Sequence, residues 1–198
     1  MAHITPLDRS DLAEFEVVFE LTEAAMGFVP RSMFTMGRNP ALLQAFAQLA
    51  GTVLGPGGEI DGGLKQLVGH VASTAAGCRY CQAHTASSAT RSGVDAAKVE
   101  AVWSFETDDR FSDAERAALR LARDAASVPN ATTQQHFDDL AAHFTEDQII
   151  EIVAVISLFG WLNRWNDTMA TDLEDEPLAF GAEHLAAAGW DAGKHAAT

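Results

Sequence analysis

Apolar residues recur along most of this chain at intervals of three and four, which is the period of one face of an α-helix. Glycine and proline interrupt the pattern, as in Pro56-Gly57-Gly58 and Pro129-Asn130, and no alternating strand-like run lies between the interruptions. The pattern therefore predicts an all-α fold, with one helical domain over residues 1–198. The expected helices are Asp11–Met26, Ala41–Leu54, Leu64–Ala76, Cys81–Ser92, Ala96–Phe105, Asp113–Ser127, Thr133–Phe144 and Glu146–Met169.

Capping residues mark the start of two of these helices. Ser112 is followed three residues later by Glu115, and Thr145 by Gln148, which is the pattern of a capping box. The end of the chain is patterned less clearly. Residues 171–176 are acidic and expected to be solvated, and residues 177–190 are expected to dock on a neighbour as a final helix. No role is expected for His3, His184 and His195 near the chain ends.

The composition indicates an acidic protein. Thirteen basic and 28 acidic residues give a formal net charge of −15, which argues against nucleic acid or an anionic membrane as a partner. A solvated acidic surface is the simplest explanation of this charge. The first residues contain no basic segment followed by an apolar run, so no signal peptide is expected, and we expect a cytoplasmic location.

The two cysteines of the chain, Cys78 and Cys81, are the strongest chemical signal. They follow Gly77, a favourable residue for a helix end, so we expect them to open the next helix. At spacing i and i+3 both sulfur atoms lie on one helix face, within reach of a disulfide, and the helix N-terminus favours a thiolate. His84 lies three residues beyond Cys81 and is the nearest candidate to carry protons.

Other interpretations of the pair remain open. Two cysteines and a histidine can contribute to a zinc site, although no second such pair completes four ligands. Free cysteines are also common in protein cores. A purely structural disulfide is the weakest alternative, because so short a loop constrains little of the unfolded chain.

The segment from Gly77 to Thr85, with Ala89 and Gly93-Val94-Asp95 after it, resembles the core signature of the alkylhydroperoxidase D and carboxymuconolactone decarboxylase superfamily. The flanking stretches 28–43 and 151–167 resemble the helices that this family places before and after its core. The resemblance spans residues 28–167 and is strongest to the peroxidase-related subgroup with a Cys-x-x-Cys. It implies a helical bundle with the cysteine pair at a helix N-terminus.

The resemblance also implies a function, a thiol-dependent peroxidase that cycles between dithiol and disulfide. In this family the second cysteine attacks the peroxide and the first resolves the product, which gives Cys81 and Cys78 these roles. The implied partners are a peroxide substrate, a dithiol or thioredoxin-like electron donor, and further copies of the chain in a trimer or hexamer. No cofactor and no metal are implied.

Two positions depart from the family pattern. The glutamate of the family's proton relay falls on Gln66, which cannot take a proton, and its histidine falls on Thr85, one residue after His84. His70, four residues after Gln66 on the same helix face, is a possible replacement base, or else an interface or surface histidine. Two further functions stay open: a decarboxylase-like enzyme that uses His70 or His84 as acid or base, and a non-enzymatic redox sensor.

Overall fold

The computed structural model describes residues 2–196, and within that range the chain is helical and contains no strand, which confirms the all-α prediction. The α-helices are α1 (Glu16–Met26), α2 (Arg31–Met36), α3 (Pro40–Leu54), α4 (Gly62–Ala76), α5 (Arg79–Arg91), α6 (Ala96–Glu100), α7 (Asp113–Ala125), α8 (Gln134–Ala141), α9 (Glu146–Met169) and α10 (Asp175–His184). Short 3₁₀ segments lie at Arg9–Phe15, Val102–Ser104, Ala186–Ala188 and Gly193–His195.

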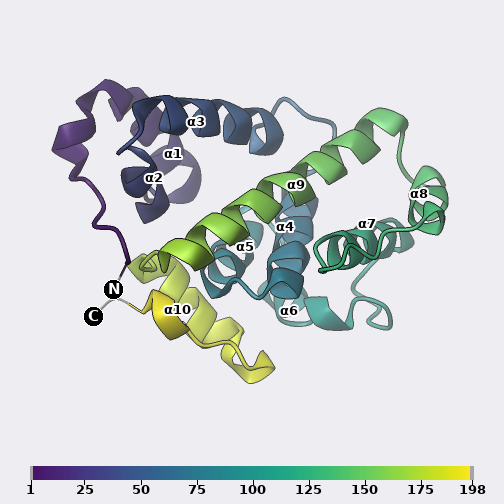
Figure 1. Ribbon diagram of the computed structural model, residues 1–198. Coiled ribbons are helices and arrows are strands. Elements are labelled where there is room, and N and C mark those ends of the chain that lie inside the picture. Colours follow the sequence, from purple (N-terminus) through teal and green to yellow (C-terminus); the bar gives the residue numbers. More distant parts are fainter. Residues whose placement is uncertain (1, 197–198) are drawn as a thin grey trace.

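The long helix α9 runs diagonally across α4 and α5 (Figure 1). Helices α1 to α3 lie on one side of α9, and α7 and α8 lie near the end at which α9 begins (Figure 1). Helix α4 packs against α5, α7 and α9, and α10 packs against α5. The pair α4 and α5, which carries both cysteines and most of the predicted site residues, therefore lies at the centre of the bundle.

Most predicted helices are present, with several differences. Helix α2 is not among the predicted helices, α8 ends at Ala141 rather than at residue 144, and α10 ends at His184 rather than at residue 190. The helix expected from Asp11 begins as a 3₁₀ segment, because Leu12 has non-helical backbone angles, and only Glu16–Met26 is regular. The helix expected over residues 96–105 ends at Glu100 and continues as a 3₁₀ turn. Both predicted capping boxes are confirmed, at the starts of α7 and α9.

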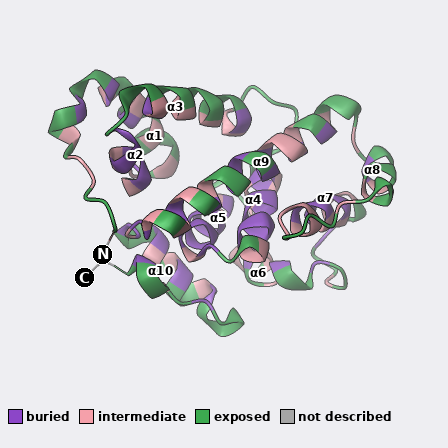
Figure 2. Ribbon diagram, viewed as in Figure 1, coloured by how far each residue is buried: buried purple, intermediate pink, exposed green. Residues whose placement is uncertain are grey.

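Burial is greatest along α4 and α5 (Figure 2). Gly69 shows how closely α4 approaches α9, since an added Cβ would lie 2.4 Å from the ring of Phe159. A second apolar cluster joins the N-terminal helices and consists of Leu12, Phe15, Phe19, Val29, Met33, Met36 and Leu43. Among residues 2–196, no helix combines the length and the apolar character that a membrane span requires.

The segment after α9 differs from its prediction. Residues 171–176 were expected to be solvated, but Thr171, Leu173 and Glu174 are buried. Leu173 donates its backbone N–H to the carbonyl of His195, and Trp190 donates its indole N–H to the carbonyl of Arg79 at the start of α5. The C-terminal segment thus folds back over the cysteine-bearing helix of its own chain.

Candidate functional site

The turn between α4 and α5 places the two cysteines. Gly77 ends α4 in the left-handed conformation (φ +77°), which glycine adopts without steric strain, and its N–H bonds to the last carbonyls of α4. Cys78 is the N-cap residue of α5, and Cys81 lies in the first turn of that helix. Both side chains are buried, at 1% and 2% exposure, so neither thiol is freely accessible.

The two thiols differ in acidity. A hydrogen bond from the Cys81 thiol lowers the pKa of Cys78, although burial opposes this shift. Burial raises the pKa of Cys81 well above its ordinary value, and donation to Cys78 raises it further. The amide of Asn166 on α9 donates to the Cys81 sulfur at 3.5 Å, which is a weaker effect. Cys78 is therefore the cysteine that loses its proton first.

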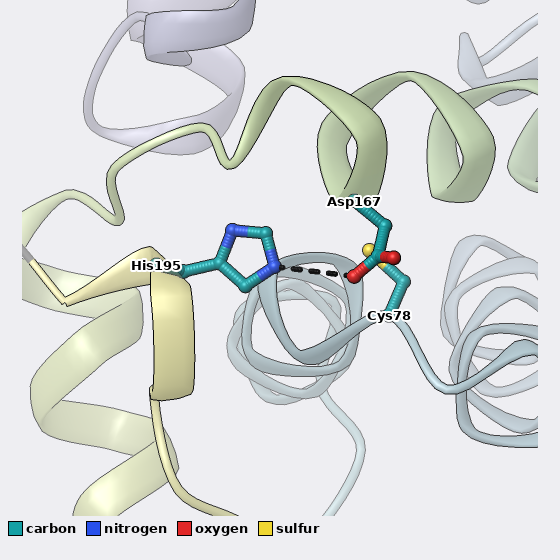
Figure 3. Close-up of side chains that lie close together, drawn as sticks. All are labelled: Cys78, Asp167 and His195. Atoms are coloured by element: carbon teal, nitrogen blue, oxygen red, sulfur yellow. Dashed lines mark ion pairs between the residues drawn. The ribbon is translucent and has the colours of Figure 1, made fainter. Parts of the chain in front are cut away.

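Cys78 also has two titratable neighbours, which we call the Cys78 cluster: Asp167 from α9 and His195 from the C-terminal segment (Figure 3). One side-chain ligand atom from each of the three residues lies within 4.8 Å of the others. His195 Nε2 lies 3.6 Å from Asp167 Oδ1, and Lys194 contacts the other carboxylate oxygen at 2.9 Å. Three segments far apart in the sequence thus meet at one sulfur atom.

The hydrogen bonds of His195 determine which ring nitrogen is protonated. Nδ1 lies 2.8 Å from the backbone carbonyl of Thr171, which can only accept, so Nδ1 carries the proton. Nε2 is then an unprotonated acceptor, and within residues 2–196 it has no hydrogen-bond partner. Burial lowers the pKa of His195, so the ring is neutral near pH 7. This geometry allows His195 to accept the proton of Cys78.

A second cluster lies further along α5, and we call it the Glu174 network. The carboxylate of Glu174 accepts hydrogen bonds from His84 at 2.6 Å, from the Tyr80 hydroxyl at 2.9 Å and from the backbone N–H of Arg31. His84 also stacks on the ring of Tyr80. Burial opposes ionisation of Glu174, but the charge of His84 and these bonds leave its pKa lowered.

The other residues predicted for the site take different places. His84 is directed to Glu174 in this network, and the structure records no contact between its ring and a cysteine. The Nδ1–H of His70 bonds to the carbonyl of Gln82, next to the Thr85 hydroxyl, and burial lowers the His70 pKa to about 4. Gln66 is half-buried on α4.

Sequence reasoning missed His195 and left Asp167 without a definite role. The apolar spacing of Leu178, Leu185 and Trp190 was the available signal, because a tail with such residues must cover another surface.

A groove of about 940 Å³ lies beside the Cys78 cluster, between α9 and the end of α7. Asp167 belongs to both the groove and the cluster. Asn163, one turn earlier on α9, lines the groove, is 4% exposed, and has no partner among residues 2–196 for either amide atom. The remaining lining is mainly small or apolar, including Ala75, Ala76, Leu121, Ala125, Val153 and Ile156.

Comparison with known proteins gives both family and fold. The model of the carboxymuconolactone decarboxylase family matches residues 40–124. A cysteine-to-alanine variant of the debrominase Bmp8, solved in complex with 2,3,4-tribromopyrrole, is 39% identical, with TM-score 0.86 and coverage of 92% of this chain and 99% of that chain. The apo structure of Bmp8 is 40% identical, with TM-score 0.84 and coverage of 90% and 95%. None of the curated protein sequences matches the chain.

More distant structures share the fold. An uncharacterised peroxidase-related protein from Ralstonia eutropha JMP134, described as an alkylhydroperoxidase AhpD core, is 20% identical, with TM-score 0.78 and coverage of 89% of this chain and 94% of that chain. The family match, the similarity to Bmp8 over nearly the whole of both chains and this shared helical fold agree with the resemblance of the cysteine segment. The chain therefore belongs to the alkylhydroperoxidase D and carboxymuconolactone decarboxylase superfamily.

Proposed function

We propose that this protein is a dithiol-dependent reductive dehalogenase of small brominated aromatic rings, with Cys78 as the nucleophile. The observation that carries the proposal is the identity of 39–40% to a debrominase over nearly the whole of both chains. The peroxidase-related neighbours are only 18–20% identical and support the fold alone. The Cys78 cluster supplies the chemistry that such a reaction needs.

The electron balance fits a dithiol. Replacement of a ring bromine by hydrogen takes two electrons and one proton and releases bromide. Oxidation of Cys78 and Cys81 to a disulfide yields two electrons and two protons, so ring C–Br and two thiols become ring C–H, bromide, one proton and a disulfide. In this scheme His195 takes the Cys78 proton, and the thiolate attacks the bromine and breaks the C–Br bond. The ring carbanion that results takes the proton held by His195. The Cys81 thiol then displaces bromide from the Cys78 sulfur, loses its proton and completes the disulfide.

The groove has suitable properties for such a substrate. Its volume of about 940 Å³ lies in the range of small-molecule sites, roughly 300–1,000 Å³, and its small apolar residues can contact a flat ring. The buried amide of Asn163 can accept a hydrogen bond from a ring N–H. Asp167 connects the groove to Cys78.

The test uses the reduced full-length chain, freed of reductant, and pyrroles that carry one to four bromines. We expect one bromide released per disulfide formed in a single turnover, and continued release when a phosphine or dithiol reductant is added. Cys78→Ser should release none. A hydroxylated ring product, or bromide release that leaves both thiols free, would overturn the proposal, because hydrolysis needs no electrons.

A thiol-dependent peroxidase is the second candidate. The dithiol favours it, because a peroxide and two thiols react to give a disulfide, one water and an alcohol, or a second water if the peroxide is hydrogen peroxide. The dithiol undergoes the same two-electron oxidation as in debromination. In the family scheme Cys81 attacks, and a carboxylate at the position of Gln66 takes the proton. If this is the reaction, Gln66→Glu should raise the rate of peroxide consumption, by up to about 10²-fold, and leave bromide release unchanged.

Neither candidate function determines the partners. A dithiol or thioredoxin-like donor stays the expected source of electrons for both, and assembly into a trimer or hexamer stays a prediction. Competition between hydrogen peroxide and a bromopyrrole for the same reduced dithiol ranks the two substrates directly. If neither substrate oxidises the dithiol, the redox sensor or the decarboxylase-like enzyme becomes the better explanation.

A further inference from the structure

The Cys78 cluster contains a donor set that its proposed role in reduction does not exhaust. A thiol, a carboxylate and an imidazole converge there, and His195 is fully buried with Nε2 unpartnered within residues 2–196. A buried acceptor without a partner costs free energy, because it gives up its hydrogen bond to water and gains none in the protein. A ligand that accepts this lone pair, and those of the neighbouring sulfur and oxygen, would remove that cost.

We propose that Cys78, Asp167 and His195 form a binding site for a thiophilic divalent cation, with Zn²⁺ as the best match. Thiolate, imidazole and carboxylate are the three ligand types that zinc takes in proteins. The proposal concerns the resting, reduced chain and does not rest on the proposed dehalogenation.

The distances require little rearrangement. Zinc bonds of about 2.0–2.3 Å in a tetrahedron place neighbouring ligand atoms roughly 3.3–3.6 Å apart. His195 Nε2 and Asp167 Oδ1 are already 3.6 Å apart, and the three ligand atoms lie within 4.8 Å of one another. The side chains must therefore close by about 1.5 Å at most. Cys81 does not belong to this group of three, so the fourth position is left to water or to another small ligand.

The surroundings of His195 already resemble those of a metal-bound histidine. Such histidines donate their second ring N–H to a carbonyl or carboxylate, which fixes the tautomer and directs the lone pair at the metal. The bond from Nδ1 to the carbonyl of Thr171 does this. Lys194 contacts only the Oδ2 atom of Asp167, and its own side chain is half exposed, so Oδ1 remains available.

Binding has a chemical consequence. Zinc displaces the proton of Cys78 and holds the sulfur as a thiolate, releasing one proton per metal ion. A sulfur bound to zinc is a weaker nucleophile than a free thiolate, and it must leave the metal before it can join Cys81 in a disulfide. The site would protect the dithiol from oxidation, and a disulfide would in turn prevent binding.

The experiment measures Zn²⁺ binding to the reduced full-length chain by competition with a chromophoric chelator, with a phosphine reductant that does not retain zinc. We expect one ion per chain. Cobalt in place of zinc should give a sulfur-to-cobalt charge-transfer band, which reports a thiolate ligand independently of any activity. Chain oxidised to the disulfide should bind neither ion at this site.

Variants then identify the ligands. We expect zinc affinity to fall by about 100-fold in each of the three ligand variants, Cys78→Ser, Asp167→Asn and His195→Ala. This is at least as large as the loss of roughly 10- to 100-fold that follows substitution of residues that only support metal ligands. Cys81→Ser should bind zinc like the wild type. His136→Ala is the matched control, because His136 pairs with Asp124 at 2.9 Å without a cysteine nearby. His195→Ala removes a buried ring and could lower binding through a loss of folding. Asp167→Asn changes a half-exposed side chain and therefore provides a second test. Circular dichroism of both variants checks that their helical content is unchanged.

Each alternative outcome has a defined meaning. Binding that requires both cysteines but not His195 or Asp167 would place the ion on the dithiol and overturn the proposed ligand set. Binding that no variant weakens would indicate the acidic surface alone and would overturn the site. Bromide release by a chain that binds no zinc would leave the proposed function intact and exclude only the metal site.

Discussion

The Cys78 cluster and the Glu174 network both pair a buried histidine with a carboxylate beside α5, and both depend on the segment after α9, yet they differ in how completely their polar atoms are bonded. None of the buried side-chain nitrogen or oxygen atoms of Tyr80, His84 and Glu174 lacks a partner among the described residues. In the Cys78 cluster, His195 Nε2 has no hydrogen bond within the same part of the chain.

This difference separates structure from chemistry. A fully bonded buried network holds its elements together, and the Glu174 network ties α10 to α5 and to the start of α2. A buried donor or acceptor without a partner costs stability, so its persistence suggests a role in binding or catalysis. The two sites therefore make opposite predictions for substitution of their histidines.

The largest effect is expected from the cysteines. Cys78→Ser should abolish bromide release, by about 10⁴-fold or more, because the covalent nucleophile is lost. Cys81→Ser should still form one debrominated ring per chain, because the Cys78 thiolate remains, and then stop, because no second thiol displaces the bromine from the Cys78 sulfur. Rapid-quench measurement of the first turnover and of later turnovers separates the two. A first turnover in Cys78→Ser with none in Cys81→Ser would reverse the assignment, in favour of the roles that the family resemblance implies.

His195→Ala should lower the rate of the first turnover by about 10²- to 10⁴-fold, because proton removal from Cys78 would then depend on solvent. The rate of the variant should rise with pH where that of the wild type is already level, since hydroxide replaces the base. His184→Ala is the matched control, as His184 belongs to the same segment but pairs with Glu100 at the surface. An unchanged pH profile in His195→Ala would leave the residue with a structural role only.

The sequence predicted the helices better than the sites for a physical reason. Helix periodicity, capping boxes and the turn at Gly77 are local properties, and they placed Cys78 and Cys81 at the start of α5. The partner of each histidine is separated from it by long stretches of sequence: Glu174 is 90 residues from His84. No local pattern encodes such a contact, because it depends on how the C-terminal segment docks.

The spacing argument for His84 illustrates the limit. Its position three residues after Cys81 indicated a shared helix face, but its ring is held by stacking on Tyr80 and by the bond to Glu174. The acidic residues 171–176 read as solvated because composition does not show which carboxylate has a buried partner. Only the packing of α10 on α5 separates Glu174 from its exposed neighbours Asp175 and Glu176.

His84→Ala should mainly affect stability. Removal of the ring leaves the buried carboxylate of Glu174 without the hydrogen bond from His84 at 2.6 Å, which is expected to lower the free energy of unfolding by about 3 kcal/mol. The rate per folded molecule should fall much less than in His195→Ala. Urea unfolding gives the first quantity and active-site thiol titration normalises the second. A stable His84→Ala protein with no activity would instead place His84 in the reaction.

Glu174→Gln should have the smallest effect, because the amide can still accept from Tyr80 and the backbone of Arg31. The loss of charge assistance in the bond to His84 is expected to cost about 1–2 kcal/mol near neutral pH.

The lowered pKa of Glu174 adds a pH dependence. A carboxyl group with a lowered pKa in the folded state stabilises the protein above its ordinary pKa of 4.5, and this stabilisation is lost as the pH falls through the lowered value. The stabilities of wild type and variant should therefore converge in acid, and urea titrations above and below pH 4.5 measure this. A difference that stays constant across this range would mean that Glu174 is held by its hydrogen-bond geometry rather than by its charge.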